Sequence, residues 1–245
     1  CSHSETDIEK ALEGNYKFEH VFALKQALEL YDFYDLQLQA CDAELEKLYQ
    51  AFEPSDDPGT QAPPPRTSKR RKNQPFFDLS QSLYHMTGVD LVRIDGLDAM
   101  TVQKIISEVG LDMNKWPTVK HFTSWLRLSP NNQVTGGKIK RSSTLPTQNR
   151  ANTAFRLAAQ SLARSNCALG GFYRRMRARK GAPKAITATA HKLARIFYTM
   201  LKHRREYCDP GFDYYERQYQ ERVIRNLCRK AAQLGYCLEP LSTKT

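Results

Sequence analysis

The chain has 245 residues, of which 40% are hydrophobic, and its formal net charge is +11. This length and apolar content suffice for an ordinary core and one accessory element, and they exclude disorder throughout the chain. No apolar run approaches the roughly 20 residues that a membrane-spanning helix needs, and the first residues lack the features of a signal peptide. We therefore expect an intracellular protein with no membrane partner.

The six cysteines do not form a metal-binding pattern. They are scattered, with no Cys-x-x-Cys pair and no histidine at zinc-finger spacing. We interpret them as small core residues or unused thiols, because disulfides are rare in intracellular chains of this size. No metal site is expected within this chain. Because Cys1 stands where an initiator methionine is usual, we expect a fragment or the product of a disrupted reading frame.

The charge is distributed unevenly along the chain. Residues 1–65 hold 4 of the 37 basic and 14 of the 26 acidic side chains, so residues 66–245 hold 33 and 12. The first part has a net charge of −10 and the second a net charge of +21. A domain this basic attracts polyanions, of which nucleic acid is the commonest. Its basic residues are spread over several elements and do not line one amphipathic helix, which argues against an anionic membrane as the partner.

Residues 18–52 predict one long helix, because they contain neither proline nor glycine. Apolar side chains recur there at steps of three and four residues, close to a heptad repeat: Val21, Leu24, Leu28, Tyr31, Leu38, Cys41, Leu45, Leu48 and Phe52. An isolated helix cannot bury such a stripe. We therefore predict a coiled-coil dimerisation region over residues 1–53. A helical hairpin with a helix outside this sequence is the alternative.

Residues 54–75 are rich in proline and polar residues and predict a linker that is partly extended. The linker ends in the basic run Lys69, Arg70, Arg71 and Lys72. This run either contacts phosphates or keeps the linker extended by charge repulsion. Beyond it, residues 76–245 predict a compact multi-helix domain, so that the whole chain is expected to be mainly α.

Residues 87–110 resemble a helix-hairpin-helix in pattern. Gly96 lies in a tight turn before a helix whose apolar residues are Val102, Ile105, Ile106 and Val109. In such a hairpin, backbone N–H groups at the start of a helix can bind a phosphate oxygen. Asp98 instead suits the N-cap of the following helix, so Gly96 has either a phosphate-binding role or a packing role.

A second helix is expected over residues 118–128, with Phe122, Trp125 and Leu126 in the core. Residues 131–150 then predict a polar, basic loop of the kind on which chemistry often occurs. Its hydroxyl-bearing candidates are Thr135, Ser142, Ser143 and Thr144.

Three helical patterns follow residue 150, and we expect Gly170, Gly171 and Gly181 to separate them. Basic side chains occur at several turns, with almost no acidic ones among residues 109–205. Guanidinium groups at this spacing match a phosphate backbone. We predict nucleic-acid contacts by Arg150, Arg156, Arg174, Arg175, Arg177, Lys184 and Lys192.

Residues 212–240 predict a closing helix. The side chains expected to face inward are Tyr215, Tyr219, Val223, Leu227, Ala231 and Leu234.

The chain resembles the C-terminal part of transposases of the insertion-sequence 110, 116 and 902 group. The segments that carry this resemblance are HMTGVDLVRIDGLDAMTVQKIISEVGLDMNKW, HFTSWLRLSPNNQVTGGK, NRANTAFRLAAQSLARS and LGGFYRRMRARKGAPKAITATAHKLARIFYTMLK. The segment LEGNYKFEHVFALKQALELYDFYDLQLQACDAE is similar to the coiled coil of the same proteins.

The resemblance implies an RNA-guided DNA recombinase that works in bacteria, in the cytoplasm at the nucleoid. Its members carry a RuvC-like domain with magnesium-binding carboxylates, then a coiled coil, then a domain with a serine nucleophile. A structured guide RNA pairs with the DNA, and the protein acts as a dimer or tetramer. We expect magnesium only together with the RuvC-like domain, because its acidic residues are not in this sequence.

The family's nucleophilic serine precedes a glycine, and here Thr135 takes that position in Val-Thr-Gly-Gly-Lys. Threonine keeps the hydroxyl, but its methyl group restricts χ1 and crowds an in-line attack. Ser142 and Ser143 are alternative nucleophiles. The resemblance further implies nucleic-acid contacts at Gly136, Gly137, Lys138, Lys140 and Arg141.

Two other functions stay open at this point. A catalytically inactive, dimeric nucleic-acid-binding remnant is the second interpretation, since the carboxylates are missing from this sequence and threonine replaces the serine. A general helix-hairpin-helix repair factor is a third interpretation, disfavoured by the extent of family-like sequence around Thr135.

Overall fold

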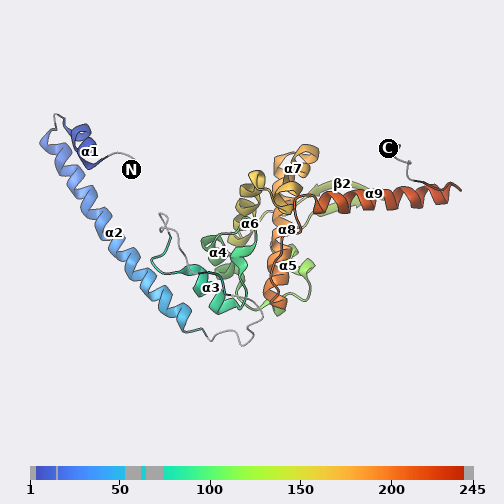
Figure 1. Ribbon diagram of the computed structural model, residues 1–245, viewed down its shortest axis with the longest axis horizontal. Coiled ribbons are helices and arrows are strands. Elements are labelled where there is room, and N and C mark those ends of the chain that lie inside the picture. The colour runs from blue at the N-terminus through green and yellow to red at the C-terminus, as the bar shows by residue number, and fades with distance from the viewer. Residues whose placement is uncertain (1–3, 15, 53–61, 65–73, 240–245) are drawn as a thin grey trace. The chain divides into compact units, whose positions relative to one another are not determined.

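The computed structural model describes residues 4–14, 16–52, 62–64 and 74–239. Helices account for most of these residues (Figure 1), so the predicted mainly α fold class is confirmed. The chain divides into two compact units, one of residues 1–51 with 69–77 and the other of residues 52–68 with 78–245. The basic run 69–72 and most of the predicted linker lie outside the described residues.

The first unit consists mainly of α1 (Glu5–Leu12) and α2 (Phe18–Gln50). Ser4 caps α1 through a capping box, in which its hydroxyl accepts from the Asp7 N–H at 3.3 Å and the Asp7 carboxylate accepts from the Ser4 N–H at 3.4 Å. The predicted long helix is confirmed, since α2 runs for 33 residues without a break.

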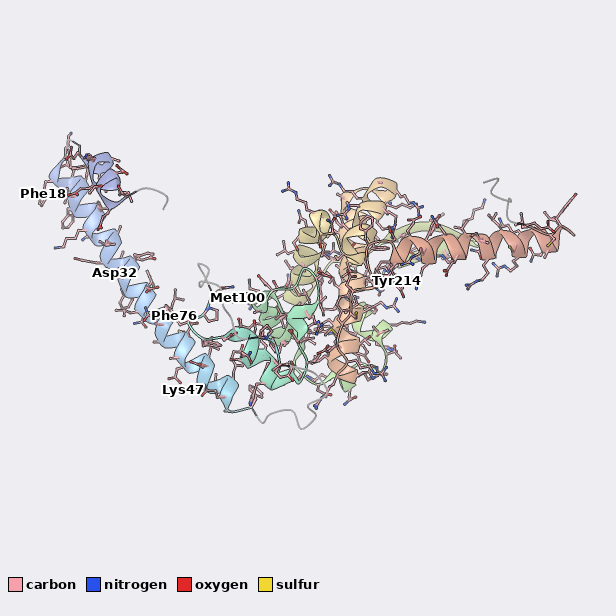
Figure 2. The ribbon with its side chains drawn as sticks, in the orientation of Figure 1. Phe18, Asp32, Lys47, Phe76, Met100 and Tyr214 are labelled. Atoms are coloured by element: carbon pink, nitrogen blue, oxygen red, sulfur yellow. The ribbon has the colours of Figure 1, made fainter. Side chains whose placement is uncertain are left out.

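The side chains of α2 project outward along its whole length (Figure 2), and none of its residues is buried within the described part of the chain. The predicted stripe is therefore exposed, from Val21 at 52% and Leu24 at 70% to Leu48 at 61%. Near the end of the helix, the Phe76 N–H donates to Asp42 and the Phe77 ring packs 6.0 Å from that of Tyr49.

The second unit contains the remaining elements in chain order. These are α3 (Leu79–Thr87), η1 (Leu91–Arg93), α4 (Ala99–Val109), η2 (Met113–Lys115), α5 (Val119–Trp125), β1 (Asn131–Thr135), β2 (Lys138–Ser143), α6 (Arg150–Ser161), η3 (Leu162–Arg164), α7 (Ala168–Lys180), α8 (Ala182–His203) and α9 (Tyr214–Gln233).

The core of this unit forms around α8, which packs against α5, α6 and α7. Its buried residues recur at helical spacing and are mostly small or apolar, so neighbouring helices approach closely. The Phe197 ring meets that of Phe155 of α6 edge-on at 5.5 Å, and the Tyr198 hydroxyl donates to the Trp116 carbonyl at 2.7 Å. These contacts tie α8 to both α6 and the segment before α5.

Two sequence predictions about the early helices hold. In α4 the predicted residues Val102, Ile105, Ile106 and Val109 are buried. In α5 Phe122 is fully buried, and so is Leu126 directly after the helix. Trp125 was expected in the core but stays 40% exposed, because its ring covers that of Trp116 at 5.0 Å from the outer side.

The expected break at Gly170 and Gly171 is wrong, because both residues lie inside the first turn of α7. A side chain there would collide with its surroundings: a Cβ at Gly170 would lie 2.2 Å from the Ser165 carbonyl, and one at Gly171 would lie 2.7 Å from the Phe212 carbonyl. Glycine is thus required by close packing and not by a turn. Gly181 does separate α7 from α8, with φ at +81°.

The last helix, α9, packs on α7 over its first half only. Tyr215, Tyr219 and Val223 are partly buried, as expected. The prediction is wrong for Leu227 and Leu234, which are 51% and 75% exposed, because in the described part of the chain nothing packs against that end of the helix.

Candidate nucleic-acid interface

The segment around Thr135 is a β-hairpin, where a polar loop was expected. β1 and β2 pair antiparallel, with Thr135 opposite Lys138 and only Gly136 and Gly137 between them. Both glycines have positive φ, at +56° and +75°. A two-residue hairpin turn needs this left-handed backbone at both positions, which glycine adopts without strain. The turn therefore follows directly from the Gly-Gly pair.

The hairpin presents its tip to the outside. Thr135 is exposed, and a Cβ built on Gly136 or Gly137 would meet nothing within 4 Å in the described part of the chain. Among the described residues, no hydrogen bond or ion pair joins Thr135 to the arginine-rich helices. The turn is thus open to a partner molecule, and contact between it and the arginines remains a prediction.

Two lysines, Lys138 and Lys140, lie on β2, the strand that pairs with the one carrying Thr135. Because Lys138 is the cross-strand partner of Thr135, the two side chains start from the same face of the hairpin. The register skips Lys140, since Gln133 faces Arg141 and Val134 faces Ile139. Such a bulge increases the local twist of the ribbon. Lys138 and Lys140 are both exposed.

Arg156 of α6 holds the base of the hairpin. Its Nη2 donates to the hydroxyl of Thr144, directly after β2, at 3.4 Å. Its Nη1 donates to Thr187 of α8 at 3.0 Å, and its Nε donates to Asn152 at 2.8 Å. Burial lowers the pKa of this guanidinium. The structure thus gives Arg156, predicted as a nucleic-acid contact, a positioning role between the hairpin and the helical core.

Gly96 also has a packing role. A Cβ there would lie 2.9 Å from the Leu162 side chain and 3.0 Å from the Ala158 carbonyl. Asp98 caps α4 by accepting from the Thr101 N–H at 2.8 Å, as the sequence suggested. The Asp98 carboxylate thus already accepts from a backbone N–H at the start of α4 that a bound phosphate would need. Phosphate binding by Gly96 stays a prediction.

The other predicted contacts differ in their surroundings. The guanidinium of Arg174 donates to the carbonyls of Ala163 and Ser165, both at 2.9 Å, and stacks on Phe212 at 5.1 Å. It therefore fixes the loop before α7. In contrast, Arg150, Arg177 and Lys184 are exposed at or near helix ends.

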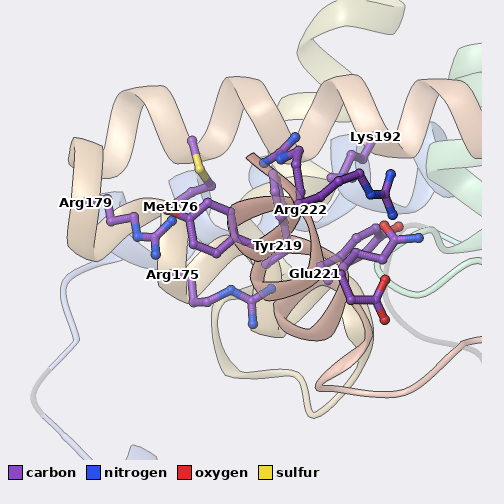
Figure 3. A pocket seen from close by; sticks show the side chains of 11 residues that line it. Arg175, Met176, Arg179, Lys192, Tyr219, Glu221 and Arg222 are labelled. Atoms are coloured by element: carbon purple, nitrogen blue, oxygen red, sulfur yellow. The ribbon is translucent and has the colours of Figure 1, made fainter. Parts of the chain in front are cut away.

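Two of the predicted residues, Arg175 and Lys192, meet in a cleft between α7, α8 and α9 (Figure 3). The cleft has a volume of about 540 Å³ and is basic and aromatic in character. Its lining residues are Phe172, Arg175, Met176, Arg179, Lys192, Tyr215, Gln218, Tyr219, Glu221, Arg222 and Arg225.

Aromatic rings hold several of these cations in place. Lys192 Nζ lies 3.8 Å from the centre of the Tyr215 ring and 4.6 Å from that of Phe172. The guanidinium of Arg179 lies 4.2 Å, and that of Arg222 5.6 Å, from the centre of the Tyr219 ring. A ring face attracts a cation without neutralising its charge, so the cleft keeps a positive potential.

The two central cations of the cleft are incompletely compensated. Arg175 donates from Nε to Glu216 at 2.9 Å, but its Nη2 is buried without a hydrogen-bond partner. Burial, together with the charges of Arg195, Arg222 and Arg175, lowers the pKa of Lys192 to about 8. Burial and the neighbouring charges disfavour the cationic state of Lys192 in the free protein, and an anion in the cleft would reduce that cost.

The sequence pattern did not reveal the contribution of α9. Arg222, Arg225 and Tyr219 come from the helix that was interpreted as closing the core. A signal for this role is present in the sequence, because tyrosine and arginine are interspersed along residues 214–225. A helix that closes a core usually carries an aliphatic stripe instead. Arg179 was not among the predicted contacts either, although it lies on the same helix as Arg175.

Two kinds of feature are absent from the described residues. In them, no group of three or more His, Cys, Asp or Glu residues is placed to hold a metal ion. No described helix is both long and apolar enough to cross a membrane.

Residues 90–174 match the model of a family described as Transposase IS116/IS110/IS902 family. This segment belongs to that transposase family. It extends from η1 into α7 and includes Thr135, Arg156 and Arg174, which confirms the resemblance noted in the sequence. Comparisons of the chain with curated proteins and with solved structures find no match.

The transposase segment, residues 90–174, contains the whole hairpin but ends one residue before Arg175. The cleft is therefore built almost entirely from residues that follow this segment.

Proposed function

We propose that this chain is the part of a bacterial DNA transposase that binds DNA and a structured guide RNA and supplies a nucleophilic hydroxyl for strand cleavage. The observation that carries the proposal is that the family match encloses the hairpin on which Thr135 is presented. The family makes the chain a DNA-recombining protein in general terms. The role of Thr135, the RNA and the site of action at the nucleoid are our inferences.

In the proposed step, the Oγ1 atom of Thr135 forms a bond to a backbone phosphorus, and one bridging P–O bond of the DNA breaks. The hydroxyl proton ends on the deoxyribose oxygen that leaves, so that no oxidant or reductant is needed. The exposed tip lets the phosphate approach in line. Lys138, across the strand pair, is placed to stabilise the charge that develops on the phosphate. The magnesium ion that the family uses is assigned to a RuvC-like domain, and no step here involves it.

The exposed stripe of α2 supports the inferred assembly. A 33-residue helix with no buried residue leaves its leucines in water unless another helix covers them. We propose that a second copy of α2 does so, giving the dimer or tetramer in which one subunit's hairpin would face another subunit's RuvC-like domain.

The test is covalent capture of DNA by the chain joined to, or mixed with, a RuvC-like domain and its guide RNA. We expect a protein–DNA adduct whose phosphothreonine maps to Thr135 by mass spectrometry. Thr135→Ala abolishes the adduct, and Thr135→Ser preserves or raises it, because serine lacks the crowding methyl group. Ser142→Ala and Ser143→Ala, which remove neighbouring hydroxyls, serve as controls and leave the adduct intact. An unchanged adduct in the Thr135→Ala variant refutes the assignment.

The alternative function is an inactive, dimeric nucleic-acid-binding remnant, favoured by the threonine at the nucleophile position. It predicts that no variant forms an adduct, including Thr135→Ser, while binding to DNA or structured RNA persists. In either case the affinity falls steeply as salt increases, because the basic side chains release counterions from the phosphate backbone.

A further inference from the structure

The cleft between α7, α8 and α9 combines features that the proposed strand cleavage does not use. It lies almost wholly outside the transposase segment, and its volume of about 540 Å³ is in the range of small-ligand sites. Five cationic side chains line it against one carboxylate in the lining, that of Glu221. The carboxylate of Glu216 in addition bonds to Arg175.

We propose that this cleft binds the phosphodiester of a single nucleic-acid strand, with an adjacent unpaired base stacked at its edge. The inference rests on the nucleic-acid binding proposed above and assigns one site of it. The chemistry is the same for an RNA strand and for an unpaired DNA strand.

The buried Nη2 of Arg175 is the first reason. A buried guanidinium N–H without an acceptor is unfavourable, because the group has lost water and gained nothing in return. Arg175 lines the cleft and is held through its Nε bond to Glu216, so a movement of the guanidinium that brings Nη2 into the cleft would let it donate to a bound acceptor. A phosphate oxygen is such an acceptor, and phosphate and guanidinium are matched in geometry.

The way the cations are held is the second reason. Lys192 lies against two rings, and Arg179 and Arg222 both lie against Tyr219. They are therefore ordered before any ligand binds, which reduces the entropy lost on binding. Figure 3 shows the labelled basic side chains around the cleft, which they line from helices α7, α8 and α9.

The presence of the Tyr219 ring next to the guanidiniums of Arg179 and Arg222 is the third reason, and it favours a single strand. Bases stack on tyrosine rings and on guanidinium planes, but only when they are unpaired and can leave the helical stack. A duplex keeps its bases inside and can offer the cleft only its outer phosphates. Single-strand selectivity therefore distinguishes this site from the general attraction of a basic surface.

The experiment measures fluorescence anisotropy of the complete 245-residue chain with three labelled probes: an oligo-dT strand, an oligo-U strand and a DNA duplex, all of equal length. The decisive variant is Arg222→Gln, and its matched control is Arg229→Gln, which removes the same charge from the same helix outside the cleft. Circular dichroism confirms that both variants keep their helices.

We expect Arg222→Gln to weaken single-strand binding by about tenfold, the effect of one charge-assisted hydrogen bond. Its effect on duplex binding stays within about twofold, the size expected for one rim charge. Arg229→Gln changes the affinity for the single strands and the affinity for the duplex by no more than about twofold. Tighter binding of oligo-U assigns the site to RNA, and tighter binding of oligo-dT assigns it to DNA.

Equal losses in the two variants, or equal losses for single strand and duplex, overturn the inference while leaving the proposed function standing. Failure of the unaltered chain to bind any probe, by contrast, overturns the proposed function itself. Photo-cross-linking with a 5-bromouracil strand supplies an independent readout, because it does not depend on a variant. Cross-links on the peptide containing Tyr219 support the inference, and cross-links confined to other peptides contradict it.

Discussion

Lys192 lies between two aromatic rings, with Arg195 on its own helix, Arg175 on α7 and Arg222 on α9 contributing positive charge. Burial is the main cause that lowers its pKa from 10.5 to about 8. In the unfolded chain the ordinary value returns, so between pH 8 and 10.5 the unfolded state binds more protons than the folded state. The buried charge of Lys192 therefore lowers the free energy of unfolding by its full amount below pH 8, and this destabilisation decreases as the pH rises from 8 to 10.5.

We expect the free energy of unfolding of the native chain to rise from pH 8 to pH 10, relative to that of the Lys192→Met variant. Methionine keeps the aliphatic stem and removes the charge, so the difference isolates the titration of this one group. Urea denaturation at several pH values measures it. Parallel pH profiles for the two proteins would show that the Lys192 pKa is not lowered.

At the scale of elements, the placement of α9 depends on Gly171. Alanine is ordinarily favoured over glycine inside a helix by about 1 kcal/mol. Here a methyl group would lie 2.7 Å from the Phe212 carbonyl, so the clash reverses the sign. We expect Gly171→Ala to destabilise the fold by about 1–3 kcal/mol and to raise amide exchange in the segment leading into α9. Gly170→Ala is the matched comparison, because its clash is with Ser165 and disturbs the loop before α7 instead. Unchanged exchange at α9 in the Gly171→Ala variant contradicts this role.

The sequence predicted those elements whose pattern is local and repeated. The long helix α2 and the four apolar positions of α4 belong to this class, since local composition and helical spacing alone place them. The hairpin was missed, although Gly136 and Gly137 between Val134 and Ile139 are a recognised turn signal. The polar, basic character of the flanking residues suggested a loop, because the described side chains of β1 are all exposed and show no alternation of buried and exposed positions.

The candidate site was predictable only in part, for a similar reason. Arginine-rich helices indicate a basic surface, but which arginines converge depends on tertiary packing. Arg175 and Lys192 meet because α7 and α8 are adjacent, whereas Arg174, its neighbour in sequence, points to the Ser165 carbonyl. Close approaches such as that of Gly170 to the Ser165 carbonyl also leave no periodic trace in the sequence.

At the scale of the whole molecule, the exposed stripe of α2 is the surface through which we propose that copies of the chain associate. We expect Leu28→Asp to weaken self-association by at least about tenfold, since a charge inserted in an apolar seam loses its hydration. Leu36→Asp is the control, because Leu36 has a similar exposure, 63% against 57%, but lies off the stripe. Sedimentation equilibrium measures both. The same association constant in the two variants, or a monomeric native chain, would contradict pairing through this stripe.

Cys41, a free and exposed thiol on the stripe of α2, makes the direction of such a pair readable. In a parallel, in-register pair the two sulfurs lie side by side, within the reach of a disulfide under mild oxidation. In an antiparallel pair centred on the helix they lie about 21 Å apart and cannot join. One sulfur atom seven residues from the helix midpoint thus records whether the C-terminal ends of two α2 helices lie at the same end of the pair or at opposite ends.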